Sequence, residues 1–422
     1  MNNWLQSTLV RVIPLALTAW VAVAPPAQAQ AQTQAQTQAA LLAPTVTAIE
    51  GTSERLVSYR NQEHMWQTAD GATHVVVNTG TQPDERSLRL YTSIDNGVTW
   101  VPGIGFDDSN ANGTADVASF GDTAEVAYST RLATIAVARL SYDPNAKTWS
   151  LSSTEVAYAS AETAGINPAL ARDAAGRTWL AFSSQDRNNS DFGIKLVLKA
   201  DAASPWVDTG MVFGPIDNVS LERSARPVVT RDGIGLVYTV HRETFWAQRS
   251  DSWPLDQAWS VQLLHTAQGQ DVDPFGSHYS VTVDDDHVVH MALVDNGQLL
   301  YMRRLAQLGF WTKKVLTGPV RATYVQAVVA AGNVMLISNH STFLRVFQSS
   351  DGGRNWSNTH WLLHAAGGGG LDYSRPRNEA PGRSTSPVPV LQQFVDGGIQ
   401  RAMVFQVPVE PVPATAVASP RR

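Results

Sequence analysis

The chain has 422 residues, of which 43% are hydrophobic and 16% are charged, and its formal net charge is −6. This acidic balance gives no electrostatic reason to expect nucleic-acid binding. The sequence contains no cysteine, which excludes disulfides, a thiolate nucleophile and a cysteine-ligated zinc site.

The N-terminal segment has the pattern of a secretory signal peptide. Arg11 precedes an apolar stretch, residues 12–24, and Ala27-Gln28-Ala29 follows it as a cleavage site. A stretch of about 13 residues is too short to span a bilayer. We therefore expect residues 1–29 to be removed by cleavage near Ala29, and the mature protein to be secreted into the periplasm or the exterior without a membrane span. Residues 30–44, rich in Ala, Gln and Thr, are expected to form a flexible linker.

A short turn motif occurs at two distant points of the chain. Residues 93–100 read S-x-D-x-G-x-T-W, and residues 349–356 repeat this pattern with Asn in place of Thr. In such a turn the Asp accepts hydrogen bonds from nearby amides, the Gly adopts a positive φ, and the Trp begins the next strand and is buried between sheets. This is the Asp-box pattern, and we assign a structural role to its residues: Ser93, Asp95, Gly97, Trp100, Ser349, Asp351, Gly353 and Trp356.

The tryptophans that close these motifs belong to a longer series with an interval of about 51 residues, which marks a repeat. The series consists of Trp100, Trp149, Trp206, Trp259, Trp311 and Trp356. Within each repeat, short runs with a period of two are separated by turn residues every 8 to 12 positions. This pattern predicts an all-β fold, a β-propeller of four-stranded antiparallel blades.

The length of the repeat region predicts the number of blades. Residues 45–408 correspond to about seven repeat intervals. We therefore expect seven blades, closed by pairing of the two terminal segments, with six blades and an added hairpin as the alternative. Residues 409–422 are rich in Pro, Ala and Val and are expected to form a disordered tail.

The ligand site of such a fold is expected at one mouth of the central channel, where the innermost strand of each blade begins. Alignment of the repeats places polar or aromatic residues at these starts: Asp116, Asn167, Arg226, His278 and Tyr324. Trp66 is their approximate counterpart in the first blade. Loops after the second strands add Arg242. A loop that follows four consecutive glycines adds Tyr373 and Arg375.

The Asp-box motifs, the blade pattern and the signal peptide resemble the sialidase superfamily over most of residues 45–408. The resemblance implies a secreted carbohydrate-active enzyme, a sialidase-like exo-glycosidase that acts on acidic glycans. It also implies arginines that bind the substrate carboxylate, a tyrosine nucleophile activated by a glutamate, and an aspartate as acid and base. The candidates in this chain are Arg226, Arg242 and Arg375 for the carboxylate, Tyr324 or Tyr373 for the nucleophile, Glu222 for its activation and Asp116 for the acid.

Three other functions remain open at this stage. A polysaccharide lyase that acts on uronate-containing glycans would use His278 or Tyr324 as base, with Arg226 and Asn167 to neutralise the uronate. A glycan-binding propeller without catalysis would present exposed aromatic residues. A structural or assembly factor would need no pocket. We predict no cofactor and no metal site, a carbohydrate partner, and a monomer.

Overall fold

The computed structural model describes residues 44–410, apart from positions 54, 58–60, 81–87, 107, 111–112, 190, 219–222, 269–278, 307, 317–320, 341–342 and 364–371. For residues 359–363 and 372–376 it describes the backbone alone. The expected signal peptide, nearly all of the linker and nearly all of the tail lie outside the described residues. Within the described part of the chain, no helix is long and apolar enough to cross a membrane.

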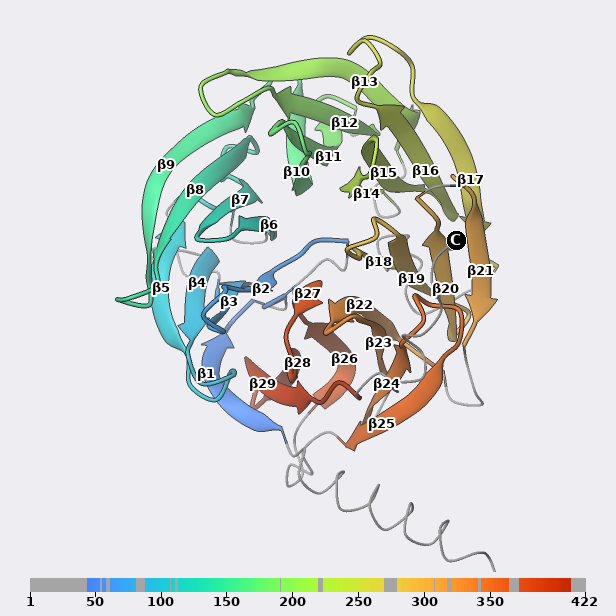
Figure 1. The fold of residues 1–422 in the computed structure, drawn as a ribbon. Helices are drawn as coiled ribbons and strands as arrows, with labels where there is room; N and C mark the ends of the chain where they lie inside the picture. The colour runs from blue at the N-terminus through green and yellow to red at the C-terminus, as the bar shows by residue number, and fades with distance from the viewer. Residues whose placement is uncertain are drawn as a thin grey trace, which may run out of the picture. The chain divides into compact units, whose positions relative to one another are not determined.

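The described chain is all β, and its strands form seven sheets arranged in a ring (Figure 1). From the innermost strand outward, blade 1 contains β2 (Met65–Gln67), β3 (Thr73–Asn78), β4 (Leu88–Ser93) and β5 (Val101–Phe106), and blade 2 contains β6 (Ala115–Phe120), β7 (Thr123–Ser129), β8 (Ile135–Asp143) and β9 (Thr148–Tyr158). Blade 3 contains β10 (Thr163–Arg172), β11 (Thr178–Asp186), β12 (Phe192–Lys199) and β13 (Trp206–Asp217), and blade 4 contains β14 (Ser224–Thr230), β15 (Gly233–Val240), β16 (Glu243–Ser250) and β17 (Ser260–Thr266).

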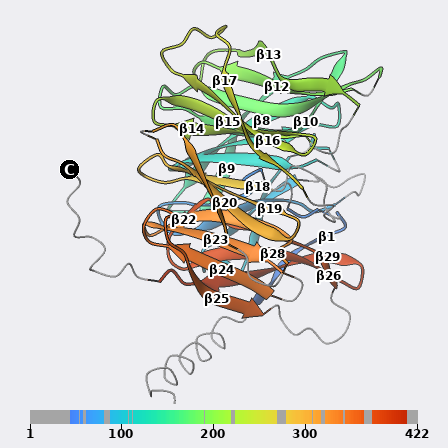
Figure 2. The ribbon, with the colours of Figure 1, turned by 90° about the vertical axis from the view of Figure 1, so that its right-hand side faces the viewer.

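The remaining three blades follow the same order. Blade 5 contains β18 (Tyr279–Val283), β19 (Val289–Asp295), β20 (Gln298–Arg304) and β21 (Trp311–Val315), and blade 6 contains β22 (Tyr324–Ala330), β23 (Asn333–Asn339), β24 (Phe343–Ser349) and β25 (Ser357–Leu363). Blade 7 contains β26 (Asp372–Glu379), β28 (Val388–Asp396), β29 (Ile399–Val407) and β1 (Thr45–Gly51), and the short β27 (Arg383–Ser384) pairs with β22. In the view turned by 90° (Figure 2), the strands of blades 4, 5 and 6 follow one another along the near side of the ring.

The two ends of the propeller meet in blade 7. The N-terminal strand β1 pairs antiparallel with β29, with Thr45 opposite Val404 and Gly51 opposite Gln400. Figure 1 shows this contact as the blue β1 beside the red β29. The prediction of seven blades closed by the terminal segments is therefore confirmed, and the six-bladed alternative is wrong. Closure completes the seventh four-stranded sheet with strands from both ends of the described chain.

The hydrophobic core is divided among the spaces between neighbouring blades. One cluster joins Trp66 and Val76 of blade 1 to Val126 and Tyr142 of blade 2. Because each sheet is covered on both faces, its inner strands lack the alternation of buried and exposed residues that a half-buried strand shows. The second strand β3, for example, is buried at all of its positions, whereas the outermost strand β5 is exposed at several.

The two predicted turn motifs lie between the third and fourth strands of blades 1 and 6 and have the expected hydrogen bonds. In the first turn, Ser93 Oγ accepts the Gly97 N–H at 2.7 Å, and Asp95 accepts the Thr99 N–H at 2.8 Å. The Trp100 indole N–H donates to the Gly97 carbonyl at 2.9 Å, and Gly97 has a φ of 84°. The turn therefore satisfies its own polar groups and directs the indole ring into the core.

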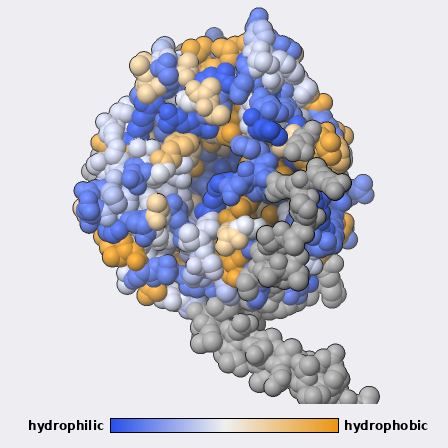
Figure 3. All heavy atoms as spheres, viewed as in Figure 1, coloured by the Kyte–Doolittle hydropathy of each residue, from blue (hydrophilic) through white to orange (hydrophobic). Residues whose placement is uncertain are grey.

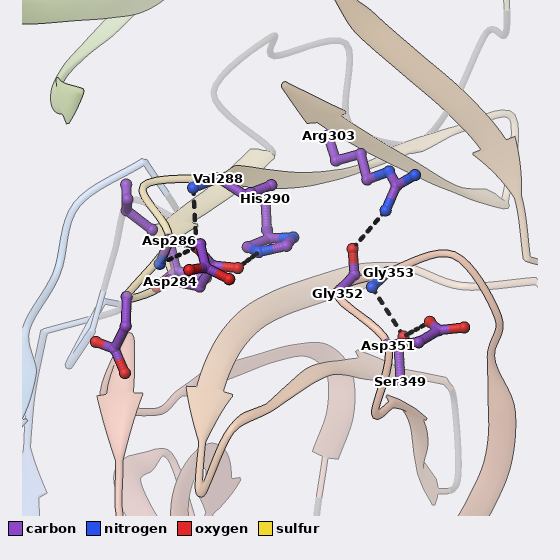
Figure 4. A network of polar contacts seen from close by, with 12 residues as sticks. Asp284, Asp286, Val288, His290, Arg303, Ser349, Asp351, Gly352 and Gly353 are labelled. Atoms are coloured by element: carbon purple, nitrogen blue, oxygen red, sulfur yellow. Dashed lines mark hydrogen bonds and ion pairs between the residues drawn. The ribbon is translucent and has the colours of Figure 1, made fainter. Parts of the chain in front are cut away.

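The second turn packs against the preceding blade. Arg303 Nη1 of blade 5 donates to the Gly352 carbonyl at 2.7 Å (Figure 4). The centroids of the Tyr301 and Trp356 rings lie 4.7 Å apart. Gly353 lies directly against the Tyr301 hydroxyl, where a Cβ would not fit. The turns of this type are thus packing elements between blades, in keeping with the structural role assigned to them.

Gly353 and its neighbour Gly352 provide a matched test of this packing. Both glycines have positive φ, at 83° and 68°, but a Cβ on Gly352 would meet nothing within 4 Å. We expect Gly353→Ala to lower the free energy of unfolding by about 1–3 kcal/mol more than Gly352→Ala, because only the former overpacks the blade interface. Urea unfolding of the two variants measures the difference. Equal losses would show that backbone strain alone acts at both positions.

Candidate functional site

The segment that leads into blade 1 enters the centre of the ring. The inner strand β2 has only three residues, and the chain before it turns inward (Figure 1). Asn61 Nδ2 donates to the Ala225 carbonyl of blade 4 at 3.4 Å, and Gln62 Nε2 donates to the Pro168 carbonyl of blade 3 at 2.7 Å. These contacts hold the segment in place, so that the next residue, Glu63, lies beside the inner strands of other blades.

Three charged side chains from distant parts of the chain meet there. Arg226 of β14 donates through Nη1 to Asp116 Oδ1 of β6 at 2.8 Å, and its Nη2 lies 3.6 Å from Glu63 Oε2. Asp116 also accepts the backbone N–H of Leu170 at 2.7 Å and that of Glu63 at 2.5 Å. The Asp116 side chain is fully buried, whereas the side chains of Arg226 and Glu63 are 14% and 19% exposed.

A third acid lies beside this cluster. Glu379, at the end of β26, accepts the His64 backbone N–H at 3.3 Å, and its Oε2 lies 3.0 Å from His64 Nδ1. Both side chains of this pair are buried. Arg226 therefore lies beside two carboxyl groups, and a third, that of Glu379, pairs with His64 and raises the pKa of Glu63.

The hydrogen bonds decide which carboxyl group carries the proton. Burial raises the pKa of Glu63 to about 8, with Arg226 acting in the opposite direction and Glu379 and Asp116 raising it further. Burial also raises the pKa of Asp116, but Arg226 and two backbone N–H groups oppose this. Because three donors converge on Asp116, we assign the charge to Asp116 and the proton at neutral pH to Glu63.

The structure brings together two of the residues selected from the sequence, Asp116 and Arg226. Tyr324 begins β22 and is buried opposite Asn339. Asn167 has a φ of 51° where the pairing of β10 with β11 shifts register. Arg242 is exposed in the turn between β15 and β16 and does not reach the cluster, so the three arginines named from the resemblance are not assembled by the described residues.

The other selected residues lie outside what the structure describes or away from the centre. Glu222 and His278 fall outside the described residues, and the side chains of Tyr373 and Arg375 do as well. Trp66 packs in the core between blades 1 and 2 rather than at the channel.

Glu63 and Glu379 were missed by the sequence analysis. The repeat alignment used Trp66 as the starting residue of blade 1, and this excluded the residues before it. The signal was the polar run Asn61-Gln62-Glu63-His64 directly before the apolar strand β2. Polar residues that precede an inner strand are the same feature that identified Asp116 and Arg226 in the other blades.

A second polar cluster lies near the turn that carries Arg242. The Asp217 carboxylate contacts Arg223 Nη2 at 2.6 Å through one oxygen and His241 Nε2 at 2.8 Å through the other. Arg223 is buried, whereas the His241 side chain is 44% exposed and its backbone has a φ of 56°. A carboxylate on Nε2 fixes the tautomer that leaves Nδ1 as a proton acceptor. This arrangement suits a general base.

The surface view is consistent with access to the middle of the ring. Figure 3 shows a hollow near the centre of this face, with hydrophilic residues around it. Within the described residues, no group of three or more metal-binding side chains is assembled.

Comparison with known proteins relates the chain to others by its fold. No family model and no curated protein matches the sequence. Solved structures do match: the α-L-arabinofuranosidase Arb93A from Fusarium graminearum shares 12% identity over 71% of this chain and 92% of its own, with a TM-score of 0.43. The polysaccharide lyase Uly1 shares 12% identity over 85% of this chain and 90% of its own, with a TM-score of 0.46.

A lectin is also among these structures. The Aleuria aurantia lectin, in complex with a fucosylated sugar, shares 11% identity over 77% of this chain and 97% of its own, with a TM-score of 0.42. These structural neighbours are carbohydrate-active proteins of three kinds: a glycoside hydrolase, a lyase and a lectin. At such low identity the likeness concerns the fold and says nothing of which reaction, if any, this chain performs.

Arg226 and Arg242 provide a matched test of the central ion pair. We expect Arg226→Ala to lower the free energy of unfolding by about 3–5 kcal/mol, because it leaves the fully buried Asp116 carboxylate without its partner. Arg242→Ala removes an exposed arginine and should change stability by less than about 0.5 kcal/mol. Chemical denaturation measures both. If the two variants are equally stable, the ion pair does not organise the centre.

The raised pKa of Glu63 predicts a pH dependence of stability. Between its usual value of 4.5 and about 8, the folded protein holds a proton on Glu63 that the unfolded chain has lost. The contribution of Glu63 to the free energy of unfolding therefore falls as pH rises through this window. We expect Glu63→Gln to show a shallower decline between pH 5 and pH 8 than the wild type, measured by urea unfolding. A decline as steep as that of the wild type would contradict the assignment of the proton to Glu63.

Proposed function

We propose that the protein is a glycoside hydrolase in which Glu63 is the general acid, with a sialidase-like action on the ends of acidic glycans. The observation that carries this proposal is the position of the Glu63 carboxyl group, 3.6 Å from Arg226 and beside the fully buried Asp116, where burial raises the pKa of Glu63 to about 8. Glycoside hydrolysis needs a protonated carboxyl group to protonate the leaving oxygen, and a raised pKa is how proteins provide one.

Arg226 has two roles in this mechanism. After Glu63 donates its proton, the new carboxylate lies 3.6 Å from Nη2 of Arg226, and the positive charge stabilises it. Nη1 already donates to Asp116 and to the Asn61 carbonyl, both at 2.8 Å. Nη2 has only the long contact to Glu63 among the described side chains, so it is the nitrogen that would bind a carboxylate of the substrate.

The limited exposure of these side chains supports action on chain ends. Glu63 and Arg226 are exposed by less than one fifth, and Asp116 is fully enclosed. A terminal sugar residue is small enough to reach such a group, whereas the middle of a polymer is held away by its neighbours on both sides. This burial supports the exo mode of action in the proposal.

The pair formed by Asp217 and His241 favours a second candidate, a polysaccharide lyase that acts on uronate-containing glycans. Such a reaction needs a base that removes the proton next to the uronate carboxylate. His241 has an oriented ring and a half-exposed side chain. In this reaction His241, and not Glu63, is the essential residue. The two proposals therefore make opposite predictions for Glu63→Gln and His241→Gln.

The glycosidase proposal predicts that Glu63→Gln lowers kcat/KM by about 10²–10⁴-fold on the substrate that the wild type hydrolyses. The substrates to compare are fluorogenic sialosides, glucuronides and neutral glycosides. Glu125→Gln is the matched control, because Glu125 is also a buried glutamate but lies in β7 and pairs with Arg139 at 3.2 Å. Full activity of Glu63→Gln would contradict the proposal.

The lyase candidate predicts that uronate polysaccharides yield an unsaturated product. This product is measured by its ultraviolet absorbance. We expect His241→Gln to abolish that product, with Glu63→Gln retaining it, if the reaction is an elimination at His241. Absorbance that persists in His241→Gln would exclude this residue as the base. If the wild type shows no activity on any of these substrates, binding to a glycan array tests the non-catalytic glycan-binding function.

A further inference from the structure

The loop that follows the inner strand of blade 7 enters the centre of the ring beside Glu63. Its residues 383–384 form β27, which pairs in parallel with the end of β22, Val329 opposite Arg383 and Ala330 opposite Ser384. This places the loop on the channel side of blade 6, because β22 is the innermost antiparallel strand of that blade. We call residues 380–385 the central loop.

The central loop is fixed to three other blades. The Gly382 carbonyl accepts the Val329 N–H of blade 6 at 2.9 Å and the Thr282 hydroxyl of blade 5 at 2.8 Å. Ser384 Oγ and the Thr385 N–H both donate to Gln67 Oε1 of blade 1, at 2.9 and 3.0 Å. The peptide groups of this loop are therefore held in place from several sides, as a positioning element requires.

Gly382 is the point at which the central loop touches Glu63. Its N–H donates a hydrogen bond to Glu63 Oε1. A Cβ added to Gly382 would lie 2.8 Å from Glu63 Oε2 and 3.1 Å from Oε1, so only a glycine lets the carboxyl group lie against the backbone here. The Gly382 N–H makes Oε1 an acceptor, whereas Arg226 Nη2 lies 3.6 Å from Oε2, too far for a strong hydrogen bond. Of the two oxygens, Oε2 is therefore the better place for the proton of the neutral carboxyl group.

We propose that the central loop selects the oxygen of Glu63 that carries the proton, with the Gly382 N–H holding Oε1 and the Thr282 hydroxyl holding the loop at the Gly382 carbonyl. Gly382 and Thr282 are positioning residues that act through Glu63. The inference rests on the proposed role of Glu63 as general acid. It assigns Oε2, the oxygen that faces Arg226, as the atom that donates the proton to a substrate.

Thr282→Val tests the proposal with little change of volume. Loss of the hydroxyl removes one of the two donors to the Gly382 carbonyl and loosens the loop there. This weakens the hydrogen bond from the Gly382 N–H to Oε1 and so disfavours the charged form of Glu63. We expect the pKa of Glu63 to rise by up to about one unit. Thr209→Val is the matched control, because Thr209 also donates to a backbone carbonyl, that of Leu196 at 2.7 Å, but lies in the outermost strand of blade 3.

Ionisation of Glu63 can be measured without a substrate. The full-length protein is labelled with glutamate that carries ¹³C at its carboxyl group, and the Glu63 signal is identified by its loss in Glu63→Gln. Titration of that signal gives the pKa in the wild type, in Thr282→Val and in Thr209→Val. A shift in Thr282→Val alone supports the inference, and equal values in all three overturn it.

Gly382→Ala is a second variant that acts on the same bond. Its added methyl group displaces the Glu63 carboxyl group, and the variant should shift the pKa in the same direction as Thr282→Val. Gly103→Ala is its control, because a Cβ there would make only an ordinary 3.5 Å contact with the Leu90 carbonyl. A purely structural role of the loop would lower the unfolding temperature of both site variants and leave the Glu63 titration unchanged.

The titration and the activity assay separate failure of this inference from failure of the proposed function. If the wild type hydrolyses a glycoside and Glu63→Gln does not, while Thr282→Val leaves the titration unchanged, the function stands and the positioning role is wrong. If Thr282→Val shifts the titration but no glycoside is hydrolysed, the positioning role stands and the function is wrong. In an active enzyme, the alkaline limb of the kcat/KM profile should move upward with the pKa.

Discussion

The buried carboxylate of Asp116 is the constraint on which the centre of this propeller depends. It accepts hydrogen bonds from Arg226 of blade 4, from the backbone of blade 3 at Leu170 and from the backbone of Glu63. A fully enclosed carboxylate is stable only when its charge is paired and its oxygens are hydrogen-bonded. The same contacts that satisfy Asp116 also place the segment before blade 1 inside the ring, and this position is what gives Glu63 its environment.

The chemistry of the site follows from an excess of negative charge. Arg226 is shared between the carboxyl groups of Asp116 and Glu63, so the one with the weaker contacts holds a proton more readily than the other. Asp116 has the larger number of donors, and Glu379 lies against His64. Glu63 is left with a single backbone donor and a long contact to Arg226, and burial raises its pKa to about 8. The structure thus separates two acids that the sequence presents as similar.

The repeated residues and the reactive residues occupy different parts of each blade. The turn motifs around Asp95 and Asp351 join the third and fourth strands. The side chains of these two aspartates accept hydrogen bonds within their own turns. The charged residues of the site lie on or before inner strands and differ from blade to blade. A ring of similar blades can therefore keep its packing elements constant while the residues at its centre vary, which is why the fold alone does not define the function.

The sequence by itself determined the features that depend on local contacts. The turn motifs, the tryptophan interval and the alternation within strands predicted the four-stranded blades, their number and the closure by the terminal segments. Asp116 and Arg226 were identified because each stands near the start of an inner strand that the repeat defines. These inferences need only neighbouring residues or a regular spacing.

Only the tertiary structure decided which residues meet at the centre. Gly382 and Glu63 are 319 positions apart, and neither occupies a repeated position. Tyr324, whose position the repeat made equivalent to those of Asp116 and Arg226, is buried at the start of β22, and Arg242 is exposed in the turn after the second strand of blade 4. The reason is physical: the blades bring many polar residues to the inner strands, and two segments outside the repeat, residues 61–64 and the central loop, determine which of them Glu63 contacts. The path of an irregular segment depends on contacts with several blades at once, and a sequence pattern does not record those contacts.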